Sequence, residues 1–298
     1  MDPAKGATNR VRQKTMSKEF IIRTMTRSEV DIAVDWAAAE GWNPGIHDAD
    51  CFWQADRTGF LGGWIGDDPV ATISVVRYGS SFGFLGFYIV NPEYRGRGYG
   101  LAIWNAGLEY LEGRTIGLDG VVAQQDNYRK SGFSLAYNNI RYEGVGGGRL
   151  PSDSPVVPLA SVSETNLFSY DRGFFPEERG NFLECWTSRP ETVSLGTLDR
   201  AGKLAGYGVT RRCRKGYKVG PLFADTPDIA EALFSSLRSA IPKQEPVFLD
   251  VPAVNPDAMA LVARHGMRPV FETARMYKGN APDLSVDRTY GVTSFELG

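Results

Sequence analysis

Apolar and polar positions along the first half of the chain fall into short runs, separated by turns rich in glycine, proline and aspartate. Short apolar or alternating runs predict strands, and apolar positions repeating every three or four residues predict helices. We expect a strand at residues 19–23, a helix after an N-cap at Ser28, and an irregular segment at 41–56. Three antiparallel strands should follow, at 60–65, 70–78 and 82–90.

The pattern changes after residue 90, where a polar, glycine-rich stretch interrupts the apolar runs. Beyond it, apolar residues return at helical spacing and predict a helix that ends near Gly113. A strand at 115–123 and a closing hairpin at 131–144 complete the predicted unit.

The second half repeats this order of elements. Strands are expected at 192–198, 203–211, 218–222 and 246–255, and helices at 228–238 and 256–264. The run GVGGG at 144–148, followed by LPSDSP, is typical of a linker. We therefore predict a disordered tail at 1–17, a first domain at 18–146, a linker at 147–160 and a second, related domain at 161–298.

The most informative motif is the heptad YRGRGYG at residues 94–100, which lies between an apolar strand and an amphipathic helix. Glycines let successive backbone N–H groups point into one concavity, and a helix start favours bound anions. A plain glycine-rich turn is the alternative. A Rossmann loop would need a βαβ unit, which the preceding antiparallel strands do not provide, and a phosphate loop of the Walker type would need Gly-Lys-Ser/Thr.

Two motifs resemble elements of the GNAT acetyltransferases. The R/Q-x-x-G-x-G/A acyl-CoA loop of that family is matched by Arg95-Gly96-Arg97-Gly98-Tyr99-Gly100. Its Tyr-x-x-x-Gly-Phe element is matched by YRKSGF at 128–133. The whole chain resembles tandem GNAT proteins whose C-terminal domain is of the YitH/HolE type. The segments that carry this resemblance are GWNPG at 41–45, DGVVAQQDNYRKSGF at 119–133, GPLFAD at 220–225 and ARMY at 274–277. The resemblance implies an α/β (α+β) chain of two GNAT folds, each a mixed, mostly antiparallel twisted sheet flanked by helices.

The same resemblance implies an N-acyltransferase that uses acetyl-CoA as cosubstrate and no metal, by direct attack in a ternary complex. The residues implied to hold the cosubstrate are Ile89, Val90, Arg95, Gly96, Arg97, Gly98, Tyr99, Gly100, Asn127 and Tyr128. Tyr128 is also the implied proton donor to the leaving thiolate, since a phenol with a pKa near 10 stays protonated at neutral pH.

The general base is open, because the strand at 82–90 contains no carboxylate. Asp119 and His47 are the candidates, either of which could act through water; each could instead have a structural role. The aromatic and acidic segment 41–56 is the candidate wall for an amine acceptor, since aromatic rings and carboxylates stabilise cations. The candidate acceptor residues are Trp42, Asn43, Asp48, Phe52 and Trp53, with Arg275 from the second domain.

The second domain lacks this chemistry. Residues 223–228 (FADTPD) stand at the loop position without a glycine series, and Val262 stands at the position of the tyrosine. We predict that this domain does not bind CoA and that it completes the acceptor site, with Asp171, Arg179 and Arg275 as candidates to reach it. Surface or interdomain ion pairing is the alternative for all three.

The composition of the chain argues against several classes of function and of bound partner. The 298 residues carry a net charge of −2 without a long basic block, which argues against a nucleic-acid partner. Three scattered cysteines and two histidines favour neither a zinc site nor a disulfide framework, and no apolar run is long enough to span a membrane. We expect a cytoplasmic enzyme acting on a small-molecule amine; transfer of a longer acyl chain, protein or peptide acetylation, and a non-catalytic acyl-CoA sensor are the alternatives.

Overall fold

The computed structural model describes residues 19–148 and 156–298. The predicted disordered tail at 1–17 lies outside these ranges, as do residues 149–155 of the predicted linker. The strands of the first half are β1 (Phe20–Thr24), β2 (Phe60–Ile65), β3 (Asp68–Tyr78), β4 (Phe82–Val90), β5 (Thr115–Val121) and β6 (Ser134–Val145). Its helices are α1 (Arg27–Ala39), α2 (Asp48–Ala55), α3 (Tyr99–Tyr110) and α4 (Gln125–Lys130).

Three local predictions for this half are wrong. Helix α1 begins after Thr26 and not after Ser28, because Thr26 and Glu29 form a capping box with their side chains and backbone N–H groups. The segment expected to be irregular contains α2. The expected hairpin is the single long strand β6, which runs straight through Asn138 and Asn139.

The second half contains the same elements in the same order, followed by the additional strand β13. Its strands are β7 (Val156–Pro158), β8 (Thr192–Leu198), β9 (Leu204–Arg212), β10 (Tyr217–Ala224), β11 (Pro246–Pro252), β12 (Arg268–Lys278) and β13 (Thr289–Gly291). Its helices are α5 (Glu164–Asp171), α6 (Gly180–Ser188), α7 (Pro227–Ser239) and α8 (Pro256–Arg264). The internal repeat predicted from the sequence is therefore visible in the structure.

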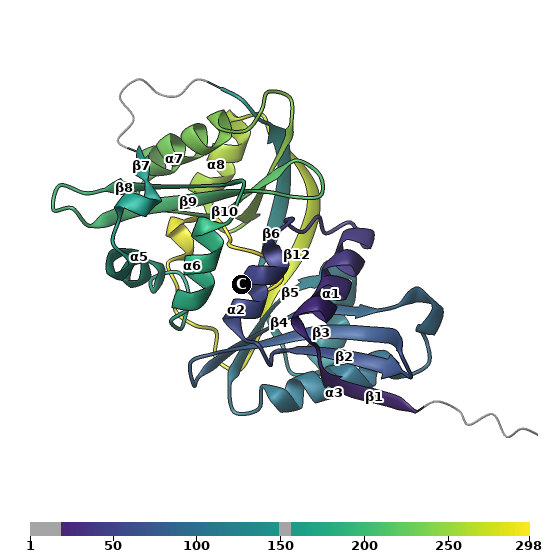
Figure 1. Cartoon of the computed structure of the whole chain (residues 1–298). Helices are drawn as coiled ribbons and strands as arrows, with labels where there is room; N and C mark the ends of the chain where they lie inside the picture. The colour runs from purple at the N-terminus through teal and green to yellow at the C-terminus, as the bar shows by residue number, and fades with distance from the viewer. Residues whose placement is uncertain (1–18, 149–155) are drawn as a thin grey trace, which may run out of the picture.

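The two halves share one continuous sheet, in the order β1-β2-β3-β4-β5-β12-β6-β11-β10-β9-β8-β7, with β13 beside β10. The long strands β6 and β12 are exchanged: β12 pairs with β5 of the first half, and β6 pairs with β11 of the second. Figure 1 shows these two strands running side by side from one lobe to the other. The sheet is mixed and mostly antiparallel, as predicted, since β4–β5 and β10–β11 are its parallel pairs.

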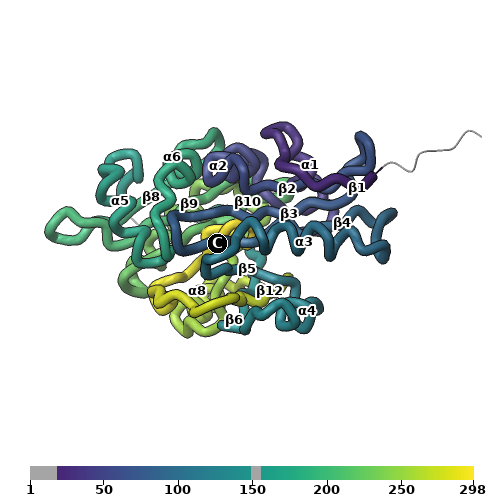
Figure 2. The backbone as a smooth tube through the Cα atoms, turned by 90° about the horizontal axis from the view of Figure 1, so that it is seen from below, coloured from purple at the N-terminus to yellow at the C-terminus, as the bar shows by residue number. Residues whose placement is uncertain are grey.

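Helices α2 and α6 bring the two halves together on one side of the sheet, and the segment 292–298 ends between the lobes (Figures 1 and 2). A disulfide joins Cys51 of α2 to Cys185 of α6, with 5.2 Å between their Cα atoms. The expectation of unpaired cysteines is wrong for these two residues. They lie 134 positions apart, so their spacing in the sequence carried no sign of the contact.

Candidate functional site

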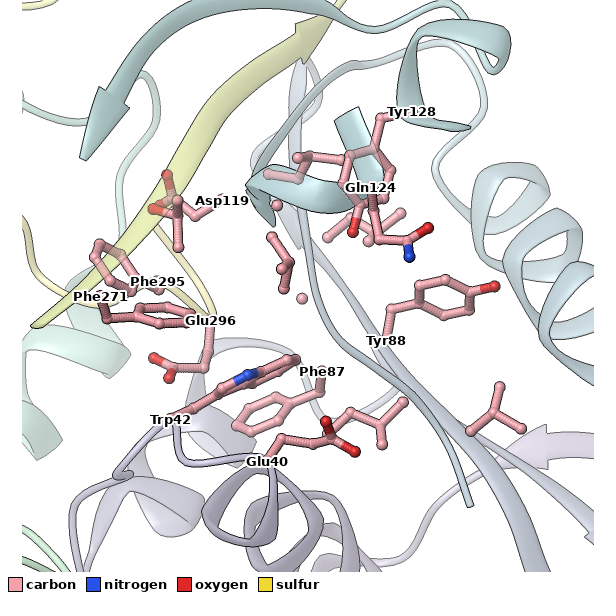
Figure 3. A pocket seen from close by; sticks show the side chains of 18 of the residues that line it. Glu40, Trp42, Phe87, Tyr88, Asp119, Gln124, Tyr128, Phe271, Phe295 and Glu296 are labelled. Carbon is pink, nitrogen blue, oxygen red and sulfur yellow. The ribbon is translucent and has the colours of Figure 1, made fainter. Parts of the chain in front are cut away.

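The two central strands of the first half separate towards one end and leave a wedge between them. β4 and β5 pair in parallel from Phe82 with Thr115 to Leu85 with Leu118, and their described pairing stops there. Beyond that point, residues 86–90 and 119–121 line a cavity of about 420 Å³ (Figure 3). Backbone groups on this edge of β4 face the cavity instead of a strand, so they suit a ligand with hydrogen-bonding groups.

A β-bulge lies on β4 beside the wedge. The pairing of β3 with β4 shifts by one residue next to the Thr72–Ile89 pair, and Phe87 at the shift has a φ of 44°. The carbonyl of Phe87 accepts a hydrogen bond of 2.9 Å from the buried hydroxyl of Thr72. A bulge changes the direction of the residues around it. Ile89 and Val90, the predicted partners of the acyl carbonyl, line the cavity directly after this feature.

The glycine-rich loop connects the end of β4 to α3. Gly96 and Gly98 have φ values of 77° and 87°, and an added Cβ at either position would meet no atom within 4 Å. Gly98 precedes Tyr99, the first residue of α3, and within the described residues no side chain caps this helix start. At Gly100 a Cβ would lie 2.8 Å from the hydroxyl oxygen of Tyr88. Open backbone N–H groups at a helix start fit the predicted pyrophosphate site.

Both loop arginines are exposed. Nε of Arg95 donates to the carbonyl of Val90 at 2.9 Å, and the guanidinium also pairs with Glu40 at the edge of the cavity. The guanidinium of Arg97 lies 5.5 Å from the centre of the Tyr94 ring. Neither arginine is held in a buried ion pair, so each is free to turn towards a phosphate.

Tyr128, on α4, lines the cavity opposite β4. Its ring stacks on Trp104 at 5.5 Å between centroids, and Gly120 makes room for it, because a Cβ there would lie 2.2 Å from the ring. Burial raises the pKa of Tyr128 to about 12, so the phenol is protonated at neutral pH. Asn127 beside it is exposed and donates to Gln124 at 2.7 Å.

Asp119 lines the cavity, but other side chains hold its carboxylate. Arg275 donates to both oxygens, at 2.9 and 2.5 Å, and Asn139 donates to one of them at 2.8 Å. Burial raises the pKa of this carboxyl, and the positive charge of Arg275 lowers it by less, so the pKa stays above its usual value. Because β12 pairs with β5 opposite Asp119, the strand exchange brings Arg275 to this place. The geometry therefore favours a bracing role for both residues over a free base.

Trp42 is the one residue of the predicted acceptor wall among those that line this cavity. Asn43 instead exchanges hydrogen bonds with the backbone of Lys215, and Asp48 forms a buried ion pair of 2.8 Å with Arg211. The other predicted members lie elsewhere in the interface. Phe52 is fully buried between Phe87 and Trp186, Trp53 packs on the same core, and His47 lines a separate small cavity next to Asp48.

Asp171 and Arg179 form a buried bidentate ion pair away from the cavity, with distances of 2.8 Å. Arg179 also donates to the side chain of Thr293 and to the carbonyl of Gly298. The second half therefore reaches the cavity through Phe271, Thr273, Phe295 and Glu296, and not through Asp171 or Arg179 as predicted.

Sequence reasoning missed Phe271, Phe295 and Glu296 among the residues that line the cavity, and the most informative of them is Glu296, in the segment 292–298. Its side chain lines the cavity, the residue is 2% exposed, and within the described residues neither carboxylate oxygen has a hydrogen-bond partner. The Glu296 backbone carbonyl lies so close to β4 that a Cβ on Gly86 would be 2.1 Å from it. A single acidic residue in the run YGVTSFELG was the signal available, and no motif contains it.

The sequence and the fold of this chain are similar to those of known proteins. The acetyltransferase (GNAT) family profile matches residues 27–133, and a second acetyltransferase (GNAT) domain profile matches 167–291. Holothin acyltransferase from Pseudoalteromonas sp. (strain SANK 73390) is 30% identical over 270 residues, which cover 91% of this chain and 92% of that protein. This chain belongs to the GNAT acyltransferase family.

Other GNAT proteins resemble the chain more distantly. An uncharacterised N-acetyltransferase from Bacillus subtilis (strain 168), YitH, is 25% identical and covers 72% of this chain and 76% of its own length. The structure of a proposed acetyltransferase from Pyrococcus horikoshii superposes with a TM-score of 0.79 at 23% identity, covering 96% and 98% of the two chains. A tandem GNAT protein from the clavulanic acid biosynthesis pathway gives a TM-score of 0.61 at 13% identity, covering 89% and 100%.

These comparisons confirm the predicted family, the pair of GNAT folds and the enzyme class, an acyltransferase. In the described part of this GNAT chain, no helix is long and apolar enough to cross a membrane. The same residues contain no group of three or more His, Cys, Asp or Glu side chains that could hold a metal ion.

Proposed function

We propose that this GNAT acyltransferase transfers an acyl group, acetyl in the first instance, from a CoA thioester to the nitrogen of a small-molecule amine in a ternary complex. The observation that carries the proposal is the wedge between β4 and β5, which opens beside an uncapped helix start and contains Tyr128. The thioester supplies the activated acyl group; the chain binds it, orients it and moves protons.

The residues around the wedge have separate tasks. The loop from Arg95 to Gly100 and the first N–H groups of α3 bind the pyrophosphate. Backbone N–H groups near Ile89 and Val90 hydrogen-bond the acyl oxygen, in positions fixed by the bulge before any reaction begins. Tyr128 donates its phenolic proton to the departing sulfur.

The acceptor binds on the side of the cavity that the second half completes. Trp42 from the first half faces Phe271 and Phe295 from the second, with Glu296 between them (Figure 3). Aromatic walls around one carboxylate suit a flat, apolar molecule that carries an amine. The similarity to a protein named for the acylation of holothin supports a small acceptor over a peptide.

The first experiment asks whether the loop binds CoA. We expect acetyl-CoA to bind the purified protein with one site per chain by calorimetry, and Arg95→Glu to weaken binding at least 30-fold, because it places a second carboxylate beside Glu40 and the phosphates. Arg212→Glu is the matched control. Arg212 is likewise about half exposed and ion-paired, with Glu191 of the second half. Equal affinity of both variants would contradict the assignment of the loop.

The second experiment identifies donor and acceptor. Mass spectrometry of the protein as purified shows which acyl-CoA it retains, and a screen of small amines with that thioester measures transfer. We expect transfer to aromatic amines above the rate of thioester hydrolysis. Binding of acyl-CoA without transfer to any amine or peptide would favour a sensor over an enzyme.

A further inference from the structure

Glu296 comes to the first half's cavity from the far end of the second half. Figure 3 shows its carboxylate between the ring of Trp42 and the rings of Phe271 and Phe295. In this family member β4 supplies no carboxylate, and the side chain of Glu296 reaches the same cavity from the opposite wall. The site is therefore complete only when the two halves are together.

The other two carboxylates that line the cavity are already engaged. Glu40 pairs with Arg95, and Asp119 accepts hydrogen bonds from Arg275 and Asn139. Glu296 differs from both, since it is almost fully buried and neither oxygen accepts a hydrogen bond from any described residue. A buried carboxylate whose oxygens accept no hydrogen bond is costly, so its position at the cavity wall suits a hydrogen-bond donor that arrives with the substrate.

The backbone on either side of Glu296 is held firmly. The hydroxyl of Tyr78 donates to the carbonyl of Leu297 at 3.1 Å, and Arg179 donates to the carbonyl of Gly298 at 3.2 Å. The N–H of Leu297 donates to the hydroxyl of Ser294 at 3.1 Å. These bonds fix the position of the carboxylate without using its oxygens.

Charged groups from the other packed strands surround this carboxylate. It interacts electrostatically with Arg141 of β6, Arg211 of β9 and Lys218 of β10. The nearby acidic and thiol groups are Asp250, which pairs with Arg141, Asp48, which pairs with Arg211, and Cys213. The positive groups balance the charge of Glu296 without donating a hydrogen bond to either of its oxygens.

We propose that Glu296 is the general base, which takes the proton from the attacking amine. An ammonium substrate first gives one proton to Glu296, and the free amine nitrogen then forms a bond to the acyl carbon. The carbon–sulfur bond breaks, the sulfur takes the proton of Tyr128, and the second nitrogen proton passes to the tyrosine oxygen. This inference rests on the proposed function and assigns a residue that reaches the first half's site from the second half.

The test compares Glu296→Gln with wild type in acetyl transfer from acetyl-CoA to two flat amines, benzylamine, which is charged at neutral pH, and aniline, which is not. With benzylamine at pH 7 we expect kcat/KM to fall by about 10²- to 10³-fold, which lies within the range for loss of a general base. With aniline the loss is at most about tenfold, because its nitrogen needs no deprotonation before attack. Calorimetric binding of acetyl-CoA stays within about twofold of wild type.

The pH profile separates a base from a structural anion. In wild type, kcat/KM for benzylamine is flat from neutral pH up to the ionisation of the amine, because Glu296 deprotonates the bound ammonium ion. In Glu296→Gln it rises about tenfold per pH unit up to the ionisation of the amine, since the variant uses the free amine only. Glu296→Asp recovers part of the activity. Glu272→Gln, which removes an exposed carboxylate from β12, keeps the wild-type profile.

Parallel profiles for Glu296→Gln and wild type, or equal losses with both amines, would show that Glu296 only neutralises its positive neighbours. In that case transfer by wild type still supports the proposed function. Absence of transfer by wild type to any amine would instead overturn the proposed function, and the role of Glu296 with it.

Discussion

The two halves of the chain differ most clearly at the places where their central parallel strands separate. In the first half, the wedge between β4 and β5 is open, and α3 starts at Gly98 without a side-chain cap among the described residues. In the second half, the parallel pairing of β10 with β11 likewise ends, after three residues where β4 and β5 have four, but β13 fills the space beside β10. Helix α7 starts with Pro227 behind a Thr226 cap.

The comparison shows how the same fold presents an open helix start in one copy and a closed one in the other. In α7, the Thr226 hydroxyl accepts from the N–H of Ile229, and proline at the first position has no N–H. Asp225 beside them accepts hydrogen bonds from Tyr170 and Arg288. Groups that would meet phosphate in the first half thus bind the chain itself in the second. The segment that follows β13 carries Glu296 into the open wedge, so the closed half contributes to the open one.

The largest effect is expected from blocking the open helix start. Gly98→Glu introduces a side chain at a φ of 87° and a negative charge where the phosphates bind, so the Kd for acetyl-CoA should rise more than 100-fold by calorimetry. Gly202→Glu is the matched control. Gly202 has a φ of 78° and equally open surroundings, but it lies in a turn of the second half. A similar loss in both variants would mean that backbone strain, and not the anion site, explains the result.

A smaller effect is expected from removing one proton donor. Tyr128→Phe should lower kcat about 10- to 100-fold, because the thiolate leaves without a proton, while the affinity for acetyl-CoA stays within about threefold. Stopped-flow or steady-state release of CoA measures this. Tyr142→Phe removes the hydroxyl of another mostly buried tyrosine, which contacts the sulfur of Met259 in the second half, and should leave kcat unchanged. Weaker binding with full turnover in Tyr128→Phe would contradict the proton-donor assignment.

The smallest effect is expected from removing the cap that closes the second helix start. Thr226→Ala should lower the free energy of unfolding by about 1 kcal/mol in urea titrations, because the N–H of Ile229 loses its acceptor. Acetyl-CoA binding should not change, and no second CoA site should appear. A second site in calorimetry would show that capping alone, and not the filled gap, keeps the nucleotide out of this half.

Much of the fold followed from local pattern. The strands at 60–65 and 82–90 and the helix at 256–264 were predicted with the bounds that the structure has, because short apolar runs between turn residues are unambiguous there. The glycine-rich loop was found for the same reason, since its residues and its position between strand and helix are contiguous in the sequence. The family resemblance added Tyr128.

The rest depended on contacts between distant segments. The run 131–144 has the composition of a hairpin, and only its partners, β11 and β12 of the other half, make it one long strand. Asp119 looked like a free carboxylate because Arg275 lies 156 positions away. Asp48 and Phe52 were assigned to the acceptor wall from composition, whereas burial between the halves gives them structural contacts. Glu296 belongs to no sequence motif. Its proposed role is suggested by the structure, in which its carboxylate oxygens have no hydrogen-bond partner among the described residues.

The exchange of β6 and β12 also determines how the molecule would respond to a break in its chain. A protease cut between Gly148 and Val156 would leave two fragments, each of which contributes a strand to the other's sheet, seven paired positions for β6 with β11 and six for β12 with β5. Because those hydrogen bonds and the Cys51–Cys185 bridge do not involve the severed peptide, the nicked protein would migrate as one particle under native conditions. An unbroken peptide backbone and structural integrity are therefore separate properties in this enzyme.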